Sequence, residues 1–230
     1  ERKCIKILGE AGRMIEKIKE IVKSIMAEEQ SQKGKKDRIV LLDPDSLGLP
    51  PITESEPRII GLFCDIIDEK IAELVQAFIY LNESNTSLPS SKKRPIEFYI
   101  STYGGNADDM FALYDVMRQI EKETEIHTIG VGKVMSAGVL LLAAGTKGRR
   151  RIGKNCRVMI HSVVAGSHGN LHSLLNEMEA VEHIQKMYTD CLIKETNMTK
   201  KQLKKMIERK VNVYLSAEEA VELGIADIII

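Results

Sequence analysis

The sequence predicts an α/β fold in which a sheet is built from strands joined by helices, with one long helix toward the end of the chain. From Arg58 onward, short apolar runs alternate with amphipathic segments, which is the pattern of strands connected by helical crossovers. The 230 residues suffice for one substantial α/β domain and an appendage. A composition of 43% hydrophobic and 29% charged residues is typical of a globular protein with a sizeable core.

The pattern divides the chain into two parts. Residues 1–57 are expected to form an N-terminal extension that ends in a proline-rich linker. Within it, apolar residues recur every three or four positions over 11–26, which predicts an amphipathic helix with one face in need of a partner. Residues 58–230 carry the alternating pattern and are expected to form the main domain.

The elements of the main domain follow from local periodicity and from turn residues. The expected strands are 59–63, 96–101, 126–131 and 157–160, and the expected helices are 68–81, 107–119, 137–144, 171–195, 200–210 and a short one after Ser216. The helix at 68–81 is expected to turn Ile71, Leu74, Val75, Phe78 and Ile79 toward the core. Ser216 and Glu219 have the spacing of a capping box at the start of the short helix.

Charge and hydropathy argue against two classes of partner. Lys+Arg and Asp+Glu balance at 33 each, so no global field attracts nucleic acid or an anionic membrane. The longest apolar run, 139–144, is too short to cross a bilayer. We therefore expect no nucleic-acid or membrane partner. The expected location is the cytoplasm, an organelle stroma or matrix, or the host cytoplasm for a viral protein.

The four cysteines suggest neither a metal site nor a disulfide framework. They are spread along the chain without a CxxC pair, at positions 4, 64, 156 and 191. We expect buried or half-buried thiols in a reducing compartment, no metal site and no cofactor.

Ser136 is the first candidate for chemistry. It lies between an expected strand and an expected helix, so its hydroxyl is placed at the positive end of a helix, where a developing oxyanion is stabilised. Serine is also a favoured N-cap residue, and an ordinary cap remains the alternative. Val134 replaces the first glycine of the G-x-S-x-G motif, which argues against an α/β-hydrolase elbow.

Two further features suggest partners for this serine. Gly104 and Gly105 end a strand, where residues without Cβ allow a tight turn whose N–H groups face a cleft. His161 follows the strand at 157–160. Taken alone, a histidine at this position is interpreted as a structural residue and not as a catalytic one. In the order Gly-Gly, Ser, His, these residues can supply oxyanion donors, nucleophile and general base to one cleft.

Other polar groups have both a functional and an ordinary interpretation. Lys133 suggests a Ser-Lys dyad or a solvated lysine, and His168 with His172 suggests a metal pair or surface histidines. The basic segments 147–151 and 200–210 suit nucleic acid or solvated surfaces.

Several segments resemble, in order, the proteolytic subunit of the Clp protease family. They are PRIIGLF, FYISTYGG, FALYDVM, VGKVMSAGVLLLAAGTKGRR, RVMIH and LSAEEAVELGIAD, and the resemblance extends from Arg58 to Ile230. It implies a crotonase-like α/β fold with a long handle helix and a serine endopeptidase with a Ser-His-Asp triad. It also implies two stacked heptameric rings that receive unfolded protein substrates from an AAA+ unfoldase of the Clp type.

Position by position, the resemblance assigns the nucleophile to Ser136 and the general base to His161. It assigns the oxyanion hole to the N–H groups of Gly105 and Ala137. Asn212 stands where the family has the triad aspartate. An asparagine can accept the Nδ1–H of histidine, although it brings no negative charge to the imidazolium.

The chain departs from the family pattern at further positions. Lys210-Val211 replaces an Asp-Arg pair, Thr102-Tyr103 replaces Ser-Pro before the two glycines, and Glu97 replaces an aromatic residue of the unfoldase-docking pocket. Should the alignment after Glu208 be shifted, Asp190 and Asn197 are the next candidates for the third member of the triad.

Two other functions compete with the peptidase. A weakly active or inactive structural ring subunit would co-assemble with an active paralogue, and Asn212 keeps this alternative open. A crotonase-fold enzyme acting on an acyl-CoA would use paired oxyanion donors but would not need Ser136 and His161.

Overall fold

The computed structural model describes residues 57–86, 88–208 and 211–230. The predicted extension, including its helix at 11–26, lies outside these ranges apart from Pro57. The strands are β1 Ile59–Leu62, β2 Ile96–Thr102, β3 Ile126–Met135, β4 Arg151–Ile152, β5 Arg157–Ile160, β6 Val213–Leu215 and β7 Ile228–Ile229. The helices are α2 Asp68–Thr86, the 3₁₀ turn η2 Ser90–Lys92, α3 Ala107–Ile120, α4 Ala137–Ala143, α5 Leu171–Glu195, α6 Lys200–Ile207 and α7 Ala217–Glu222.

The described strands form one seven-stranded sheet that branches at β3. The order along the main path is β1-β2-β3-β4-β7, while β5 pairs with β3 and with β6. Every pairing is parallel except that of β5 with β6. Strand β3 pairs with β4 through Ile129 and Gly130 and with β5 through Lys133 to Met135. The predicted strand at 126–131 therefore continues four residues further, past a kink at Gly132, where φ is 66°.

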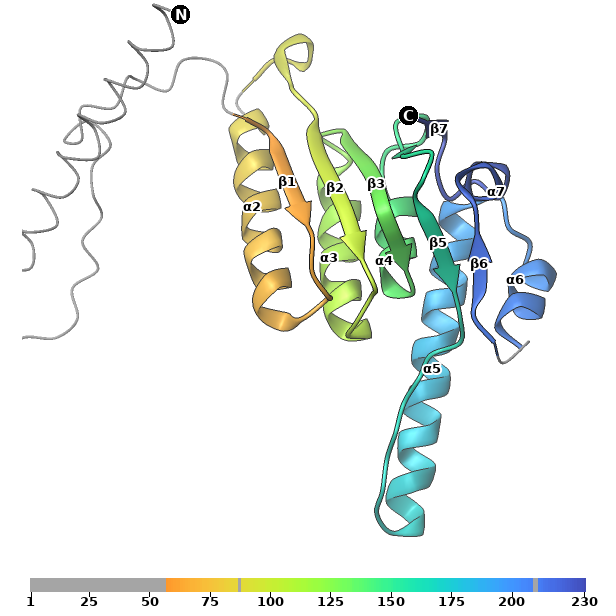
Figure 1. Cartoon of the computed structure of the whole chain (residues 1–230). Coiled ribbons are helices and arrows are strands. Elements are labelled where there is room, and N and C mark those ends of the chain that lie inside the picture. Colours follow the sequence, from red (N-terminus) through yellow and green to blue (C-terminus); the bar gives the residue numbers. More distant parts are fainter. Residues whose placement is uncertain (1–56, 87, 209–210) are drawn as a thin grey trace, which may run out of the picture. The chain divides into compact units, whose positions relative to one another are not determined.

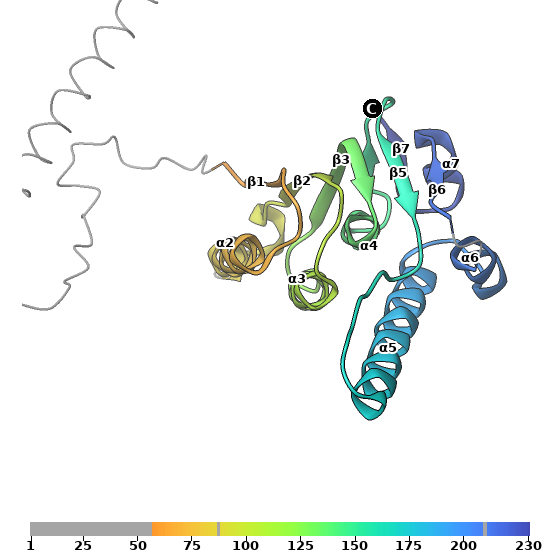
Figure 2. The same ribbon diagram turned by 60° about the horizontal axis from the view of Figure 1, so that its bottom comes forward.

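Helices cover one face of this sheet. Helices α2, α3, α4 and α5 lie on the same side, and β1, β2 and β3 present a face that no described helix crosses (Figures 1 and 2). The core lies between the two layers and includes the edge-to-face ring pair of Phe78 and Phe98, whose centroids are 5.3 Å apart. All seven residues of α4 are buried, because this helix lies in the centre of the helical layer. The predicted α/β fold is confirmed.

Two helix predictions need correction. Helix α2 runs five residues past the predicted end, and Ile79, predicted to face the core, is 47% exposed. The periodicity places Ile79 beside Val75 and Phe78. The described residues cover α2 on one side only, so its apolar stripe extends beyond the buried face. Cys64, expected to be at least half-buried, is also exposed.

The long helix α5 has two different halves. Its 25 residues correspond to roughly 38 Å, and the buried residues are confined to its C-terminal end, at Tyr188, Leu192 and Glu195. The N-terminal half and residues 161–170 leading into it project from the body of the domain (Figure 1). The glycine-punctuated segment 165–169, matched to a strand of the family, pairs with no strand in the described part of the chain.

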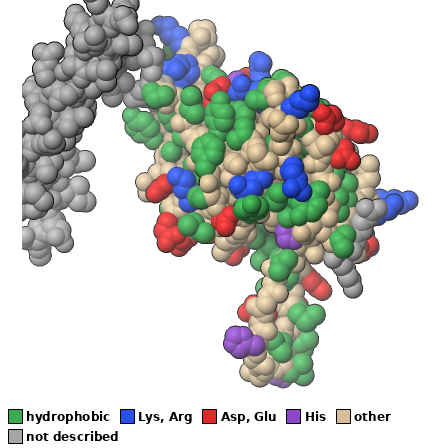
Figure 3. All heavy atoms as spheres, viewed as in Figure 1, with side chains coloured by type: hydrophobic (Ala, Val, Ile, Leu, Met, Phe, Trp, Pro, Cys, Tyr) green, Lys and Arg blue, Asp and Glu red, His purple; other side chains and the backbone are tan. Residues whose placement is uncertain are grey.

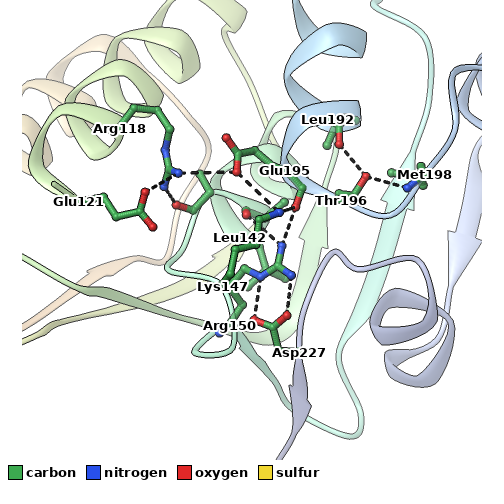
Figure 4. A network of polar contacts seen from close by, with 12 residues as sticks. Arg118, Glu121, Leu142, Lys147, Arg150, Leu192, Glu195, Thr196, Met198 and Asp227 are labelled. Atoms are coloured by element: carbon green, nitrogen blue, oxygen red, sulfur yellow. Dashed lines mark hydrogen bonds and ion pairs between the residues drawn. The ribbon is translucent and has the colours of Figure 1, made fainter.

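A network of charged groups anchors the C-terminal end of α5 (Figure 4). Glu195 is 2% exposed and accepts a hydrogen bond from Tyr114 Oη at 2.8 Å, with Arg118 3.6 Å away. Arg150 donates to the Glu195 carbonyl at 2.7 Å and also pairs with Asp227. Because these partners satisfy most polar atoms of the network, the charges are tolerated in the core.

None of the helices in the described ranges has the length and apolar character needed to cross a bilayer.

Candidate active site

The structure brings Ser136 and His161 together. Ser136 follows β3 and His161 follows β5, and these neighbouring parallel strands end at the same edge of the sheet. The Oγ of Ser136 lies 2.8 Å from Nε2 of His161, which is hydrogen-bonding distance. A nucleophile and a general base 25 residues apart in sequence are thus in direct contact.

The backbone of Ser136 is strained. Its φ of 54° and ψ of −125° make it the single non-glycine residue with positive φ in the described part of the chain. Such a conformation costs on the order of 1–3 kcal/mol and persists where surrounding contacts enforce it. Ser136 is the N-cap residue of α4, but its side chain makes no capping hydrogen bond. The ordinary N-cap alternative is therefore wrong, because the hydroxyl is directed to His161 instead.

Three hydrogen bonds hold the strained residue in place. The N–H of Ser136 donates to the Met159 carbonyl at 2.8 Å. Its own carbonyl accepts from Val139 N–H at 3.0 Å and from the Tyr188 hydroxyl at 2.9 Å. Tyr188 is 6% exposed, and burial raises the pKa of its hydroxyl far above the usual range, so the group acts as a neutral donor. Tyr188 was not among the predicted site residues, because nothing in the local sequence of α5 indicates a contact with residue 136.

Glycines bring the 102–106 turn close to Ser136. A Cβ on Gly104, where φ is 103°, would lie 2.6 Å from Cβ of Ser136. Gly105 has φ of 149°, and a Cβ there would lie 2.3 Å from the Ile66 carbonyl oxygen. The close approach of this turn requires residues without side chains at both positions.

The two N–H groups predicted to bind an oxyanion are available. The neighbouring groups of the Gly105 turn are engaged, since Ile66 N–H donates to Gly104 and Asn106 N–H donates to Ile66. Within the described ranges, the N–H groups of Gly105 and of Ala137 donate to no backbone acceptor. Both residues line a cavity of about 450 Å³ together with Ser136 and His161.

The remaining wall of this cavity comes from α3, α5 and the segment after His161. Its other lining residues are Asn106, Ala107, Asp108, Met110, Ser162, Val163, Val164, Ala165, Val181, Ile184 and Tyr188. The N–H of Val163 donates to Oε1 of Gln185 at 2.7 Å, which fixes the start of the projecting segment against α5. The cavity is therefore apolar along α5 and polar near the serine.

Asn212 lies opposite His161 when the pairing of β5 with β6 is extended by one residue, but the two side chains form no hydrogen bond. The antiparallel pairing of Ile160 with Val213, extended by one residue, places Asn212 opposite His161. Asn212 is exposed, and no hydrogen bond from its side chain is found within the described ranges. It instead lines a second hollow, of about 560 Å³, with Lys133, Arg157 and the tyrosines at 103 and 214.

The other candidates are not at the site. Lys133 lies over the Tyr103 ring at 4.5 Å, and it does not line the cavity of Ser136. His168 and His172 are exposed on the projecting part. Asp190 is an exposed residue of α5, and Asn197 packs against Gly224.

Comparison with known proteins identifies the family. Residues 55–230 match the sequence model of the family described as Clp protease. The chain is also 31% identical over 170 residues to a protein named ATP-dependent Clp protease proteolytic subunit from Oltmannsiellopsis viridis, an alignment that covers 74% of this chain and 82% of the relative. With a serine and a histidine in hydrogen-bonding contact beside two free backbone N–H groups, the chain belongs to the Clp protease family of serine-type peptidases.

Proposed function

We propose that the chain is an endopeptidase subunit in which Ser136 and His161 cleave unfolded protein substrates through an acyl-enzyme. The 2.8 Å contact between Ser136 Oγ and His161 Nε2 carries this proposal, because activation of a serine needs a base at hydrogen-bonding distance. The strained backbone of Ser136 supports it, since strain of this kind is typical of catalytic positions.

The reaction proceeds in two displacements. His161 Nε2 takes the Ser136 hydroxyl proton as Oγ attacks the scissile carbonyl, and the resulting oxyanion accepts hydrogen bonds from Gly105 and Ala137 N–H. The tetrahedral intermediate expels the amine product, which receives the proton from His161. Water then attacks the acyl-enzyme with His161 again as base, which releases the acid product and restores Ser136.

We assign the third position of the triad to Asn212. The register of β5 with β6, extended by one residue, puts Asn212 opposite His161. The proposal requires a rotation of the Asn212 side chain that brings its amide oxygen to Nδ1. That contact would hold the tautomer whose Nε2 can accept the serine proton.

The exposed half of α5 supports a larger assembly. Leu171, Leu175 and Met178 are 68%, 47% and 60% exposed, and Figure 3 shows hydrophobic side chains along the projecting part. Apolar surface of this kind is typical of a contact surface. We propose that it packs against further copies, or a paralogue, in stacked heptameric rings. Light scattering should give the mass of such a ring, and a stable monomer with full activity would exclude it.

We propose that an AAA+ unfoldase delivers the substrates, although the docking face is altered. Glu97, at the position of a docking aromatic residue, forms an ion pair with Arg151 at 2.8 Å on the face of the sheet that no described helix crosses. We expect the charged pair at this position to weaken docking, so Glu97→Tyr should strengthen binding of a Clp-type unfoldase.

Labelling with a fluorophosphonate tests the function. We expect one equivalent bound at Ser136, abolished in Ser136→Ala and retained in the control Ser162→Ala, which changes a neighbouring serine of the same cavity. Persistent peptide cleavage by Ser136→Ala would refute the assignment.

The alternative of a weakly active structural subunit has one observation in its favour, the lack of a bond between Asn212 and His161 within the described ranges. That alternative predicts ring assembly without labelling or turnover.

A further inference from the structure

The active-site cavity has two chemically different walls. Met110, Val181 and Ile184 give it an apolar side, and the first turn of α3 gives it a polar side at Asn106 and Asp108. Among its lining residues, Asp108 is the single acid, and no lysine or arginine is among them. This combination differs from a purely apolar pocket, because one end favours a positive charge.

Asp108 lies at the start of α3 and has no cationic partner among the described residues. It lies in the first turn of α3, where the helix dipole stabilises a negative charge. The Asn106 side chain caps the N–H groups of Asp108 and Asp109, so the helix does not need the Asp108 carboxylate as its cap. In the described part of the chain, no Lys, Arg or His lies within ion-pair distance of Asp108.

Two further carboxyl groups lie close enough to Asp108 or its neighbour to interact. Burial, and then repulsion from Asp68 and Asp108, raises the pKa of Asp109. A cation that enters the cavity near the start of α3 would therefore approach several acidic side chains.

Asp108 lies close along the chain to Gly105, whose N–H is a proposed oxyanion donor. Gly105 and Asp108 are three residues apart, so their Cα atoms are separated by at most roughly 11 Å. A lysine or arginine bound with its carbonyl at Ser136 can lay its methylene groups along the apolar wall and direct its charged end to the carboxylate. A shorter or neutral side chain would contact only part of this surface.

We infer that Asp108 is a specificity residue that favours lysine or arginine on the acyl side of the scissile bond. This inference rests on the proposed role of Ser136 as nucleophile. Asp108 is exposed, so solvent screens the pair and the expected gain is modest. We expect a preference of roughly three- to tenfold, the range between an exposed ion pair and a charge-assisted hydrogen bond.

The test compares two peptidyl phosphonates that differ only at the residue next to phosphorus, lysine in one and its uncharged analogue norleucine in the other. The rate of Ser136 modification on the full-length chain is followed by intact mass. The wild type should react faster with the lysine reagent, and Asp108→Asn should bring the ratio of the lysine rate to the norleucine rate down toward one. Added salt should reduce the wild-type preference and leave Asp108→Asn unaffected.

The matched control is Asp115→Asn, the same change at an exposed position of α3 that does not line the cavity. It should keep the wild-type ratio. An equal ratio in wild type and Asp108→Asn would overturn the specificity inference alone. Failure of both reagents to modify Ser136 would instead overturn the proposed function, and this inference with it.

Discussion

The hydrogen bond from Tyr188 to the Ser136 carbonyl provides a direct test of how the nucleophile is positioned. Tyr188→Phe removes only the hydroxyl that donates to this carbonyl at 2.9 Å, and the ring is 6% exposed, so the packing of the ring is retained. The Ser136 carbonyl keeps its bond from Val139 N–H at 3.0 Å and is not left without a donor. The change therefore isolates one contact of the strained residue.

The expected cost follows from that contact. Losing one neutral hydrogen bond costs about 1 kcal/mol, which is comparable with the roughly 1–3 kcal/mol of strain at Ser136. If the bond stabilises the reactive conformation, the ratio of that conformation to its alternatives falls about fivefold. We expect kcat to drop by up to this factor, KM to change little and the pH profile to stay unchanged, because His161 is not touched.

The assay combines peptide turnover, the rate of fluorophosphonate labelling and urea unfolding at matched protein concentration. Tyr99→Phe is the control, since Tyr99 is half-buried on β2 and makes no side-chain hydrogen bond within the described ranges. It should change stability by less than about 0.5 kcal/mol and leave labelling unchanged. Loss of stability in Tyr188→Phe without slower labelling would show that the bond serves packing alone, which would refute the reasoning.

Further predictions concern the oxyanion turn, the triad and the charged network. Gly105→Ala places a Cβ 2.3 Å from the Ile66 carbonyl oxygen, which should displace one oxyanion donor and lower kcat by about 10²–10³-fold. The control is Gly153→Ala, whose Cβ would meet nothing closer than 3.6 Å and should leave kcat unchanged. Asn212→Ala should lower kcat by about 10²–10⁴-fold and Asn212→Asp should keep or raise it, whereas a silent Asn212→Ala would leave a Ser-His dyad. Burial raises the pKa of Asp227, but hydrogen bonds and charge attraction from Arg150 outweigh burial and leave that pKa below its usual value. The ionised Asp227 carboxylate therefore stabilises the fold above about pH 4, and this stabilisation is lost as the pH falls further. The unfolding midpoints of wild type and Asp227→Asn should converge in acid. A difference between the two midpoints that stays constant with pH would contradict this.

The sequence alone predicted, in order, strands β1, β2, β3 and β5 and the α-helices of the main domain, and it predicted the bounds of two elements closely. The strand 157–160 and the helix 171–195 have the predicted bounds. Both are marked by local signals, namely an apolar run before His161 and an amphipathic period that begins after Asn170, whose side chain caps the helix. The order Gly-Gly, Ser, His also predicted which residues meet, because the ends of neighbouring parallel strands share one edge of the sheet.

Only the tertiary structure decided the conformation of Ser136 and its contact with Tyr188. A positive φ at a serine has no local sequence signal, since it is imposed by contacts with residues 23 to 52 positions away. Strands β4 and β7 have two residues each and were not predicted, because their pairing depends on distant partners and not on their own periodicity. The exposure of Ile79 and the burial of Glu195 were likewise decided by which faces other elements cover. Periodicity reports how residues are spaced along one element, and burial depends on what packs against that element in three dimensions.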